Sequence, residues 1–356
     1  MNLDDLEYIH LHDPQNMLAE IDNLPAQLEK AWKLGQTLPL PERKDFRQVI
    51  MSGMGGSAIG ADLLAAYTAR SCPIPVFVHR DYDLPAWAQG PETLVIASSH
   101  SGNTEETLAA FQNALQNKCT VMAIATGGTL AERAEKEKIP LWKFEHKGQP
   151  RAAVGFSFGL LLAVFARLGL IEPPDKILLE VSAAAEEMRK QQETLRADVP
   201  VTHNPAKRMA GQFVGRWVNI FGADYLAPVA RRWKDQVNEI AKAGAGFEAL
   251  PEADHNALAG LLNPADIQYH TMTIFLRAPS DHPRNHVRLD LTRHGFTVEG
   301  LNADVYEAPG KSPLAHIWTT LHFGDYTAFF LAMSYGTDPT PVEALESFKS
   351  AMKATK

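Results

Sequence analysis

Uniformly apolar runs alternate with amphipathic segments along the first half of the chain. The apolar runs predict strands, and the segments between them space their apolar residues as helices do. Strands are predicted at 47–53, 74–79, 93–99, 119–126 and 139–144, and helices at 14–35, 58–69, 105–116 and 129–137. Strands that are apolar throughout and alternate with helices are typical of a parallel sheet covered on both faces. The first half therefore predicts an α/β fold.

A second series of the same kind follows the segment IEPPDK at 171–176. Strands are predicted there at 216–222, 246–252, 270–278 and 297–303, and helices at 177–199, 226–243, 286–295, 314–336 and 341–353, while a helix at 155–169 precedes the segment. The segment IEPPDK is the best candidate for a domain boundary. We therefore predict two tandem α/β domains, residues 1–171 and 172–356, each with a parallel sheet flanked by helices.

Composition and charge narrow the class of protein. The chain has 356 residues, of which 45% are hydrophobic and 21% charged, and its net charge is -8. This charge gives no global positive field for nucleic acid or anionic membranes. The acidic N-terminus does not resemble a secretory signal, and no run approaches 18 uncharged apolar residues. Cys72 and Cys119 have no metal-type spacing, so we expect reduced thiols and a cytoplasmic protein.

Two strand-to-helix turns of the first domain are rich in glycine and hydroxyl side chains. They are SGMGGSAIG at 52–60 and SSHSGNTEET at 98–107. Hydroxyl groups and free N–H groups at helix N-termini donate to phosphate oxygens, and glycine lets the backbone come close. An N-cap alone needs only one Ser or Thr. Two such turns on one sheet therefore predict a cradle for a single phosphate group.

The first turn also fits a dinucleotide fingerprint, because Gly53, Gly55 and Ala58 match G-x-G-x-x-A. That fold places an acidic residue at the end of the next strand, whereas here the strand ends in His79 and Arg80. The Ser-rich second turn has no role in the dinucleotide scheme. A cradle for one phosphate group is thus favoured over a dinucleotide site, with a plain close-packed turn as the other interpretation.

Together, SGMGGSAIGADLL and SSHSGNTEETL resemble the sugar isomerase domain family. The likeness is greatest to the bifunctional phosphoglucose/phosphomannose isomerases of bacteria and archaea, and it covers most of the chain. His100 stands where the family commonly has Tyr. The resemblance implies two tandem sugar-isomerase-type domains. It also implies that the sugar phosphate is bound by Gly56, Ser57, Ser99, Ser101 and Thr104.

The resemblance also implies the chemistry. Aldose–ketose isomerisation moves a proton between C1 and C2 of an open-chain sugar, which needs a carboxylate base, a cation for the enediolate and groups that open the ring. In the segments NE…LPEA-x-HN and PRAA, the match makes Glu239 the base, His255 the ring-opening residue and Arg151 the cation. Lys349, in the C-terminal helix, would assist ring opening.

The family's pattern also implies no metal, no cofactor and a homodimer in which His255 is donated across the interface. The expected reaction interconverts fructose 6-phosphate with glucose 6-phosphate and mannose 6-phosphate through an enediol(ate). Relatives carry Thr near Val342, so the epimer preference stays open. A non-catalytic or regulatory sugar-phosphate-binding protein is one alternative, and an isomerase with only one of the two activities is another. The HLH triplet at 10–12 has metal-type spacing but lacks partner ligands.

Overall fold

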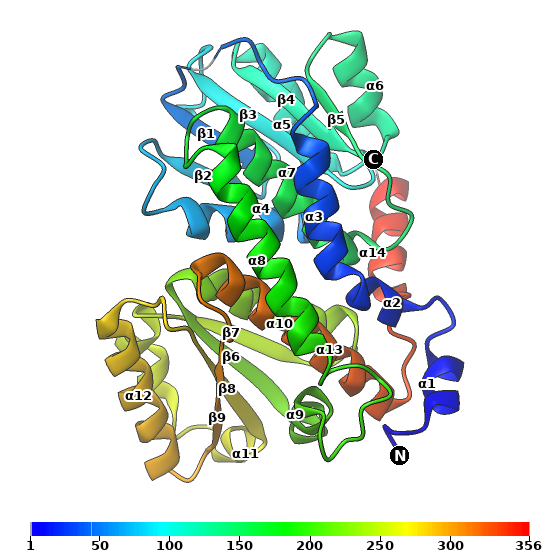
Figure 1. Ribbon diagram of the computed structural model, residues 1–356, viewed down its shortest axis with the longest axis vertical. Helices are drawn as coiled ribbons and strands as arrows, with labels where there is room; N and C mark the ends of the chain where they lie inside the picture. Colours follow the sequence, from blue (N-terminus) through cyan, green and yellow to red (C-terminus); the bar gives the residue numbers. More distant parts are fainter. Residues whose placement is uncertain (1, 44, 356) are drawn as a thin grey trace.

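The computed structural model describes residues 2–43 and 45–355, which form two parallel sheets at opposite ends of the long axis (Figure 1). The first sheet has the order β2-β1-β3-β4-β5. Its strands are β1 (Gln48–Ser52), β2 (Val76–His79), β3 (Thr93–Ser99), β4 (Thr120–Ala125) and β5 (Leu141–Lys143). β1 and β3 are neighbours in register, with Met51 opposite Ile96, so the turns that follow them lie at one edge.

Alternate residues of these strands face different helices. Ile50 and Val95 pack in the cluster that includes α5 (Glu105–Gln116) and α6 (Gly128–Lys136). Met51 and Ile96 pack in a second cluster with α3 (Leu24–Gly35), α4 (Gly55–Thr68) and α7 (Val154–Arg167). The sheet is therefore covered on both faces, as its apolar strands predict.

The helical stretch Pro150–Arg167 is the only one in the described residues whose length and composition would suit a membrane span. It comprises the 3₁₀ helix η1 (Pro150–Ala153) and α7, and 89% of it is buried inside the protein. It is therefore a buried helix of the protein core.

The second sheet has the order β7-β6-β8-β9. Its strands are β6 (Trp217–Ala223), β7 (Ala245–Leu250), β8 (Thr271–Arg277) and β9 (Asn302–Glu307). The helices around it are α8 (Pro174–Gln192), α9 (Pro205–Phe213), α10 (Ala227–Glu239), α11 (Ala265–Tyr269), α12 (Pro283–Val298) and α13 (Pro313–Tyr335), with the 3₁₀ helices η2 (Asp224–Leu226), η3 (Glu252–His255) and η4 (Ala257–Gly260).

The strand predicted at 297–303 is wrong in its position. Thr297 and Val298 favour strands by propensity, but they continue α12, and the backbone turns only at Gly300, whose φ is 72°. The strand that follows, β9, begins at Asn302. The helix predicted at 177–199 likewise ends earlier, at Gln192. The division into domains 1–171 and 172–356 stays a prediction.

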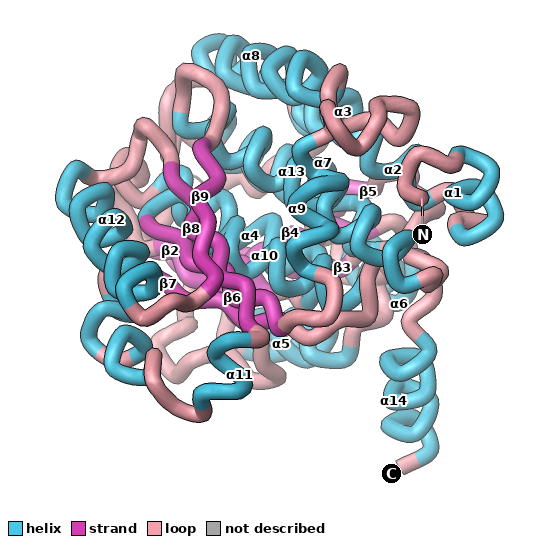
Figure 2. Tube along the Cα trace, turned by 90° about the horizontal axis from the view of Figure 1, so that it is seen from below, coloured by secondary structure: helices cyan, strands magenta, loops and turns pink. Residues whose placement is uncertain are grey.

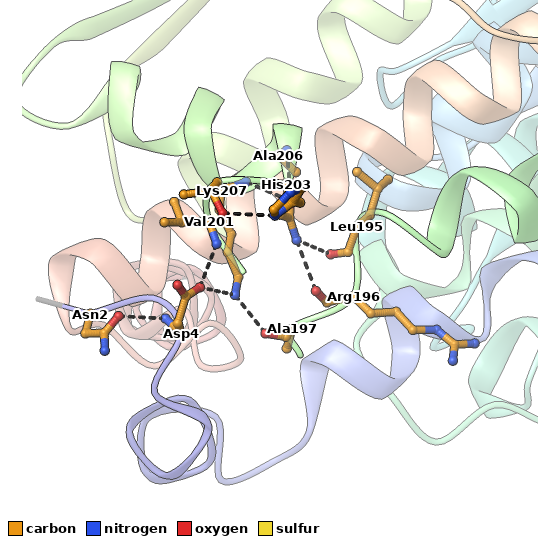
Figure 3. Close-up of polar contacts among 11 residues, drawn as sticks. Asn2, Asp4, Leu195, Arg196, Ala197, Val201, His203, Ala206 and Lys207 are labelled. Atoms are coloured by element: carbon orange, nitrogen blue, oxygen red, sulfur yellow. Dashed lines mark hydrogen bonds and ion pairs between the residues drawn. The ribbon is translucent and has the colours of Figure 1, made fainter. Parts of the chain in front are cut away.

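The N-terminal segment bridges to the second half of the chain (Figure 3). Oδ1 of Asp4 accepts hydrogen bonds from the backbone N of Val201 (2.8 Å) and from Nζ of the buried Lys207 (2.9 Å). Lys207 also donates to the carbonyl of Ala197 at 2.7 Å. The short helices α1 (Leu6–His12) and α2 (Met17–Asp22) follow, and Tyr8 of α1 donates to the carbonyl of Met333. These contacts tie the start of the chain to α9 and α13.

The last helix, α14 (Glu343–Ala354), stands apart from the other helices (Figure 2). None of its residues is buried. Leu345, Phe348 and Met352 are 44%, 63% and 44% exposed. Their spacing places these three apolar side chains on one side of the helix.

Candidate active site

The two predicted phosphate turns meet at the carboxyl edge of the first sheet. Ser57, in the first turn of α4, accepts a hydrogen bond on Oγ from the backbone N of His100 at 3.2 Å. A Cβ atom on Gly53 would lie 2.8 Å from the carbonyl oxygen of Ser98, so glycine allows this contact. A Cβ atom on Gly56 would collide with the carbonyl of Pro150, so Gly56 lets η1 approach the first turn.

The second turn is held in shape by its own hydroxyl groups. Oγ of the buried Ser99 lies 2.9 Å from Oγ1 of Thr104 and accepts from the backbone N of Gly102 at 3.1 Å. Oγ of the exposed Ser101 accepts from the backbone N of Asn103 at 3.2 Å. Thr104 is the N-cap residue of α5, yet its side chain makes no capping bond. The structure thus brings Ser57, Ser99 and Thr104 into one region at two helix N-termini, where the dipoles favour an anion.

Three polar side chains in contact with one another, His100, His146 and Glu20, support the second turn. Nε2 of His100 lies 2.9 Å from Nδ1 of His146, whose Nε2 lies 3.2 Å from Oε2 of Glu20. Since the carboxylate only accepts, His146 donates to it and in its neutral form accepts from His100. Burial, with His146 as a second cause, lowers the pKa of His100 to about 4. This chain of side chains therefore holds the neutral imidazole of His100 at the second turn.

Arg151 and Glu239 face each other across the two halves of the chain. Arg151 is 4% exposed and comes from η1, while Glu239 ends α10. Nη1 of Arg151 lies 3.7 Å from Oε2 of Glu239. Burial raises the pKa of the Glu239 carboxyl, and the charges of Arg151, Arg232 and Lys349 act against that rise. A carboxylate with a raised pKa beside a buried cation suits proton transfer from carbon.

A cavity of about 290 Å³ opens beside this pair. It is lined by Gly55, Ile59, Arg80, Arg231, Lys234, Asp235, Glu239 and Phe247, which come from both halves of the chain. Arg80 and Arg231 were not among the site residues predicted from the sequence. Both pair with the same oxygen of Asp62, at 2.5 and 3.0 Å. The signal was that Arg80 stands where a dinucleotide domain would have an acid.

His255 and Lys349 are both exposed. His255 ends η3 and is not among the residues that line the cavity at Glu239. Its neighbour Asp254 turns toward α12, where its two oxygens accept from Arg288 (2.9 Å) and Thr292 (2.6 Å). Lys349 lies on α14, and its charge reaches Glu239. The structure thus groups Arg151 with Glu239 and leaves His255 outside their cavity.

The corresponding edge of the second sheet holds one of the protein's own carboxylates. β6 and β8 occupy there the places of β1 and β3. Asp224, with φ of 46°, accepts from the backbone N of His282 (2.7 Å) and from Nδ2 of Asn285 (2.9 Å), and pairs with Arg70 (3.0 Å). An internal anion thus already fills the N-terminus of α12, which leaves the first sheet as the place for a phosphate.

Comparison with known proteins decides the family. The chain is 39% identical over 344 residues to a bifunctional phosphoglucose/phosphomannose isomerase of Caldicellulosiruptor bescii, a match that spans 96% of this chain and 100% of the relative. The chain belongs to the bifunctional phosphoglucose/phosphomannose isomerase family. A second member, from Aquifex aeolicus, is 31% identical, with 86% of this chain and 91% of the relative covered. The resemblance found in the two turns is confirmed.

Residues 202–352 match the family model described as the bacterial phospho-glucose isomerase C-terminal SIS domain. Among solved structures, the tagatose-6-phosphate ketose/aldose isomerase of Escherichia coli superposes with a TM-score of 0.71. The superposition covers 91% of this chain and 95% of that one, at 16% identity. The likeness concerns the fold alone, and it confirms the prediction of sugar-isomerase-type sheets flanked by helices. The assignments of individual site residues stay predictions.

Proposed function

We propose that this protein isomerises hexose 6-phosphates, interconverting fructose 6-phosphate with glucose 6-phosphate and mannose 6-phosphate. Membership of the family supports this activity, since the relatives from Caldicellulosiruptor bescii and Aquifex aeolicus are named for both isomerisations. The observation that carries the proposal is the pair of Arg151 and Glu239, 3.7 Å apart next to a cavity that Gly55 of the phosphate turn also lines.

The mechanism follows from what these groups do to an open-chain sugar phosphate. Donors at the two turns hold the phosphate, with Ser57, Ser99, Ser101 and Thr104 as its hydroxyl ligands and the Gly56 backbone close by. The Glu239 carboxylate removes the proton from C2 of an aldose, and the electron pair moves to the carbonyl to form the enediolate. Arg151 stabilises the charge on the enediolate oxygen. The proton on O2 then passes to O1, and Glu239, after its proton has exchanged with solvent, delivers a proton to C1 as the C2 carbonyl forms. Reversal of these steps yields an aldose.

Ring opening precedes this proton transfer, and we assign it to His255 and Lys349. His255 is exposed and stands outside the cavity of its own chain, which supports its donation into the site of a second copy. The uncovered side of α14 that bears Leu345, Phe348 and Met352 supports a dimer as well, because an apolar helix face of this kind needs a partner. The proposed assembly is a homodimer with two composite sites.

The proposed compartment is the cytoplasm. Cys72 and Cys119 are both free thiols, which supports a reducing environment. Separate fractionation of the producing cells, followed by detection of the protein, tests this assignment. Recovery in an oxidising compartment would contradict it.

The activity is tested by incubating the purified protein with fructose 6-phosphate and measuring glucose 6-phosphate and mannose 6-phosphate in separate coupled assays. Both products are expected, and Glu239→Gln is the matched control that should form neither at an appreciable rate. Formation of one product alone would favour a single isomerase. Binding of fructose 6-phosphate without any product would favour the non-catalytic sugar-phosphate-binding protein.

A further inference from the structure

The placement of α14 depends on the segment that precedes it. Within the part of the chain that the structure describes, no residue of α14 is buried, so within one subunit the packing of this helix contributes little to its position. The segment 337–342 joins it to the end of α13. Within one subunit, the contacts that hold this linker therefore determine where Lys349 lies relative to Glu239.

Two cations hold consecutive carbonyl groups of this linker. Nζ of Lys242 donates to the carbonyl of Asp338 at 2.7 Å. Nη2 of Arg151 donates to the carbonyls of Pro339, at 2.8 Å, and Thr340. Oδ1 of Asp338 accepts from the backbone N of Thr340 at 2.9 Å, which closes the turn. Hydrogen bonds from charged donors are the stronger kind, so these contacts fix the path of the linker.

The backbone around Lys242 is shaped for this contact. α10 ends at Glu239, and Lys242 follows with φ of 53°, in the left-handed region that a lysine seldom adopts. Nδ2 of Asn238 donates to the carbonyl of Ala243 at 2.8 Å and braces the turn. Burial, followed by the charge of Arg151, lowers the pKa of Lys242 to about 8. A costly conformation and a desolvated cation are both maintained here, and the cation reaches the carbonyl of Asp338 at 2.7 Å and, more weakly, the carbonyl of Ile240 at 3.2 Å.

We propose that Lys242 is a positioning residue that holds the linker at Asp338 and thereby sets where Lys349 of α14 lies relative to Glu239. This inference rests on the proposed function, in which Lys349 assists ring opening. Arg151 has two proposed interactions, since its guanidinium donates to the linker carbonyls and would also stabilise the enediolate oxygen. When Arg151 turns to the substrate, Lys242 keeps its bond to the linker.

The test compares Lys242→Met with Lys242→Arg on two substrates. Fructose 6-phosphate is largely cyclic, whereas 5-deoxyfructose 6-phosphate lacks the hydroxyl that closes the ring and needs no opening. Lys242→Met is expected to lower turnover of fructose 6-phosphate about ten- to a hundredfold, the worth of one charge-assisted hydrogen bond, and to leave the open-chain analogue within about twofold. Lys349→Met should have the same effects on the two substrates as Lys242→Met. The variant with both substitutions should be no slower than either single variant, and Lys242→Arg should turn over fructose 6-phosphate at close to the wild-type rate.

A second readout does not depend on activity. Amide hydrogen exchange of residues 343–354 should quicken in Lys242→Met at an unchanged unfolding midpoint. The matched control is Lys138→Met, since Lys138 also follows a helix with φ of 56° and is exposed. That control should leave both turnover and exchange as in the wild type.

Several results would overturn the proposal. Equal slowing of both substrates by Lys242→Met would make Lys242 part of the proton-transfer step. Unchanged exchange in α14, or multiplied effects in the double variant, would show that Lys242 and Lys349 act independently. Failure of the wild-type protein to convert either substrate would instead refute the proposed function, so the two failures are distinguishable.

Discussion

Nη1 of Arg151 lies 3.7 Å from Oε2 of Glu239, although the two residues belong to different halves of the chain. Arg151 is nearly fully buried, and the side chain of Glu239 is 29% exposed. Burial raises the pKa of Glu239 while the guanidinium opposes that rise. The contact thus joins the proposed base to the group that would stabilise its product.

Glu239→Gln should lower kcat about 10²- to 10⁴-fold, because an amide cannot accept the proton from carbon. Affinity for fructose 6-phosphate should change little, since the phosphate is held elsewhere. Steady-state kinetics and calorimetric titration measure the two effects. Glu248→Gln serves as a control, because Glu248 is also a half-buried acid but lies on β7. Activity retained in Glu239→Gln with an intact fold would eliminate Glu239 as the base.

The acid limb of the kcat/KM profile should depend on Arg151. The base must be ionised, so activity should fall as the pH drops through the raised pKa of Glu239. Arg151→Gln removes a cation that lowers this pKa, so the limb should move to higher pH. Arg151→Lys keeps a charge and should move it less. A limb that stays in place in Arg151→Gln would show that another group titrates.

Ser99→Ala should weaken phosphate binding about tenfold or more, since its hydroxyl holds both Thr104 and the backbone of Gly102. The expected sign is a higher KM for fructose 6-phosphate. Thr107→Val is the matched control within the same stretch, because the buried Thr107 hydroxyl has no hydrogen-bond partner among the described residues. Equal KM values for both variants would argue against the second turn as the phosphate cradle.

Asp281 should make stability depend on pH. Burial raises the pKa of its carboxyl from 3.8 to about 7 in the folded protein. The folded state then binds the proton more tightly than the unfolded state, so the contribution to stability is full below 3.8 and is lost as the pH rises through about 7. Asp281→Asn keeps an acceptor for the backbone N of Ala278 and cannot ionise.

Thermal unfolding measured between pH 5 and 8 should therefore show the wild type losing stability relative to Asp281→Asn as the pH rises. The exposed Asp198→Asn should show no such trend against the wild type. A parallel pH dependence of wild type and Asp281→Asn would contradict a buried, protonated Asp281.

The sequence predicted those features of the fold and the site that depend on a local pattern of residues. The apolar strands and the two hydroxyl-rich turns are contiguous, so their spacing indicates both the sheet and the phosphate cradle. Glu239, by contrast, is one of 42 acidic residues, and only the family resemblance singled it out. The bonds of Arg151 to Pro339 and Thr340 join positions 188 and 189 residues apart, which no local pattern encodes. Arg80 and Arg231 likewise meet only through the shared carboxylate of Asp62.

The predicted boundary between α12 and β9 was wrong for a different reason. Thr297 and Val298 have strand propensity, and nothing in their immediate neighbours reveals that the helix continues to Val298. The glycine that ends the turn lies two residues further on, at Gly300.

The most direct test of the account is proton NMR of fructose 6-phosphate incubated with the protein in D2O, with and without a chelator. The account predicts glucose 6-phosphate and mannose 6-phosphate that both carry deuterium at C2, at rates that the chelator does not change. Products formed without deuterium would contradict exchange of the transferred proton with solvent, and loss of turnover in the chelator would contradict a metal-free enediolate route.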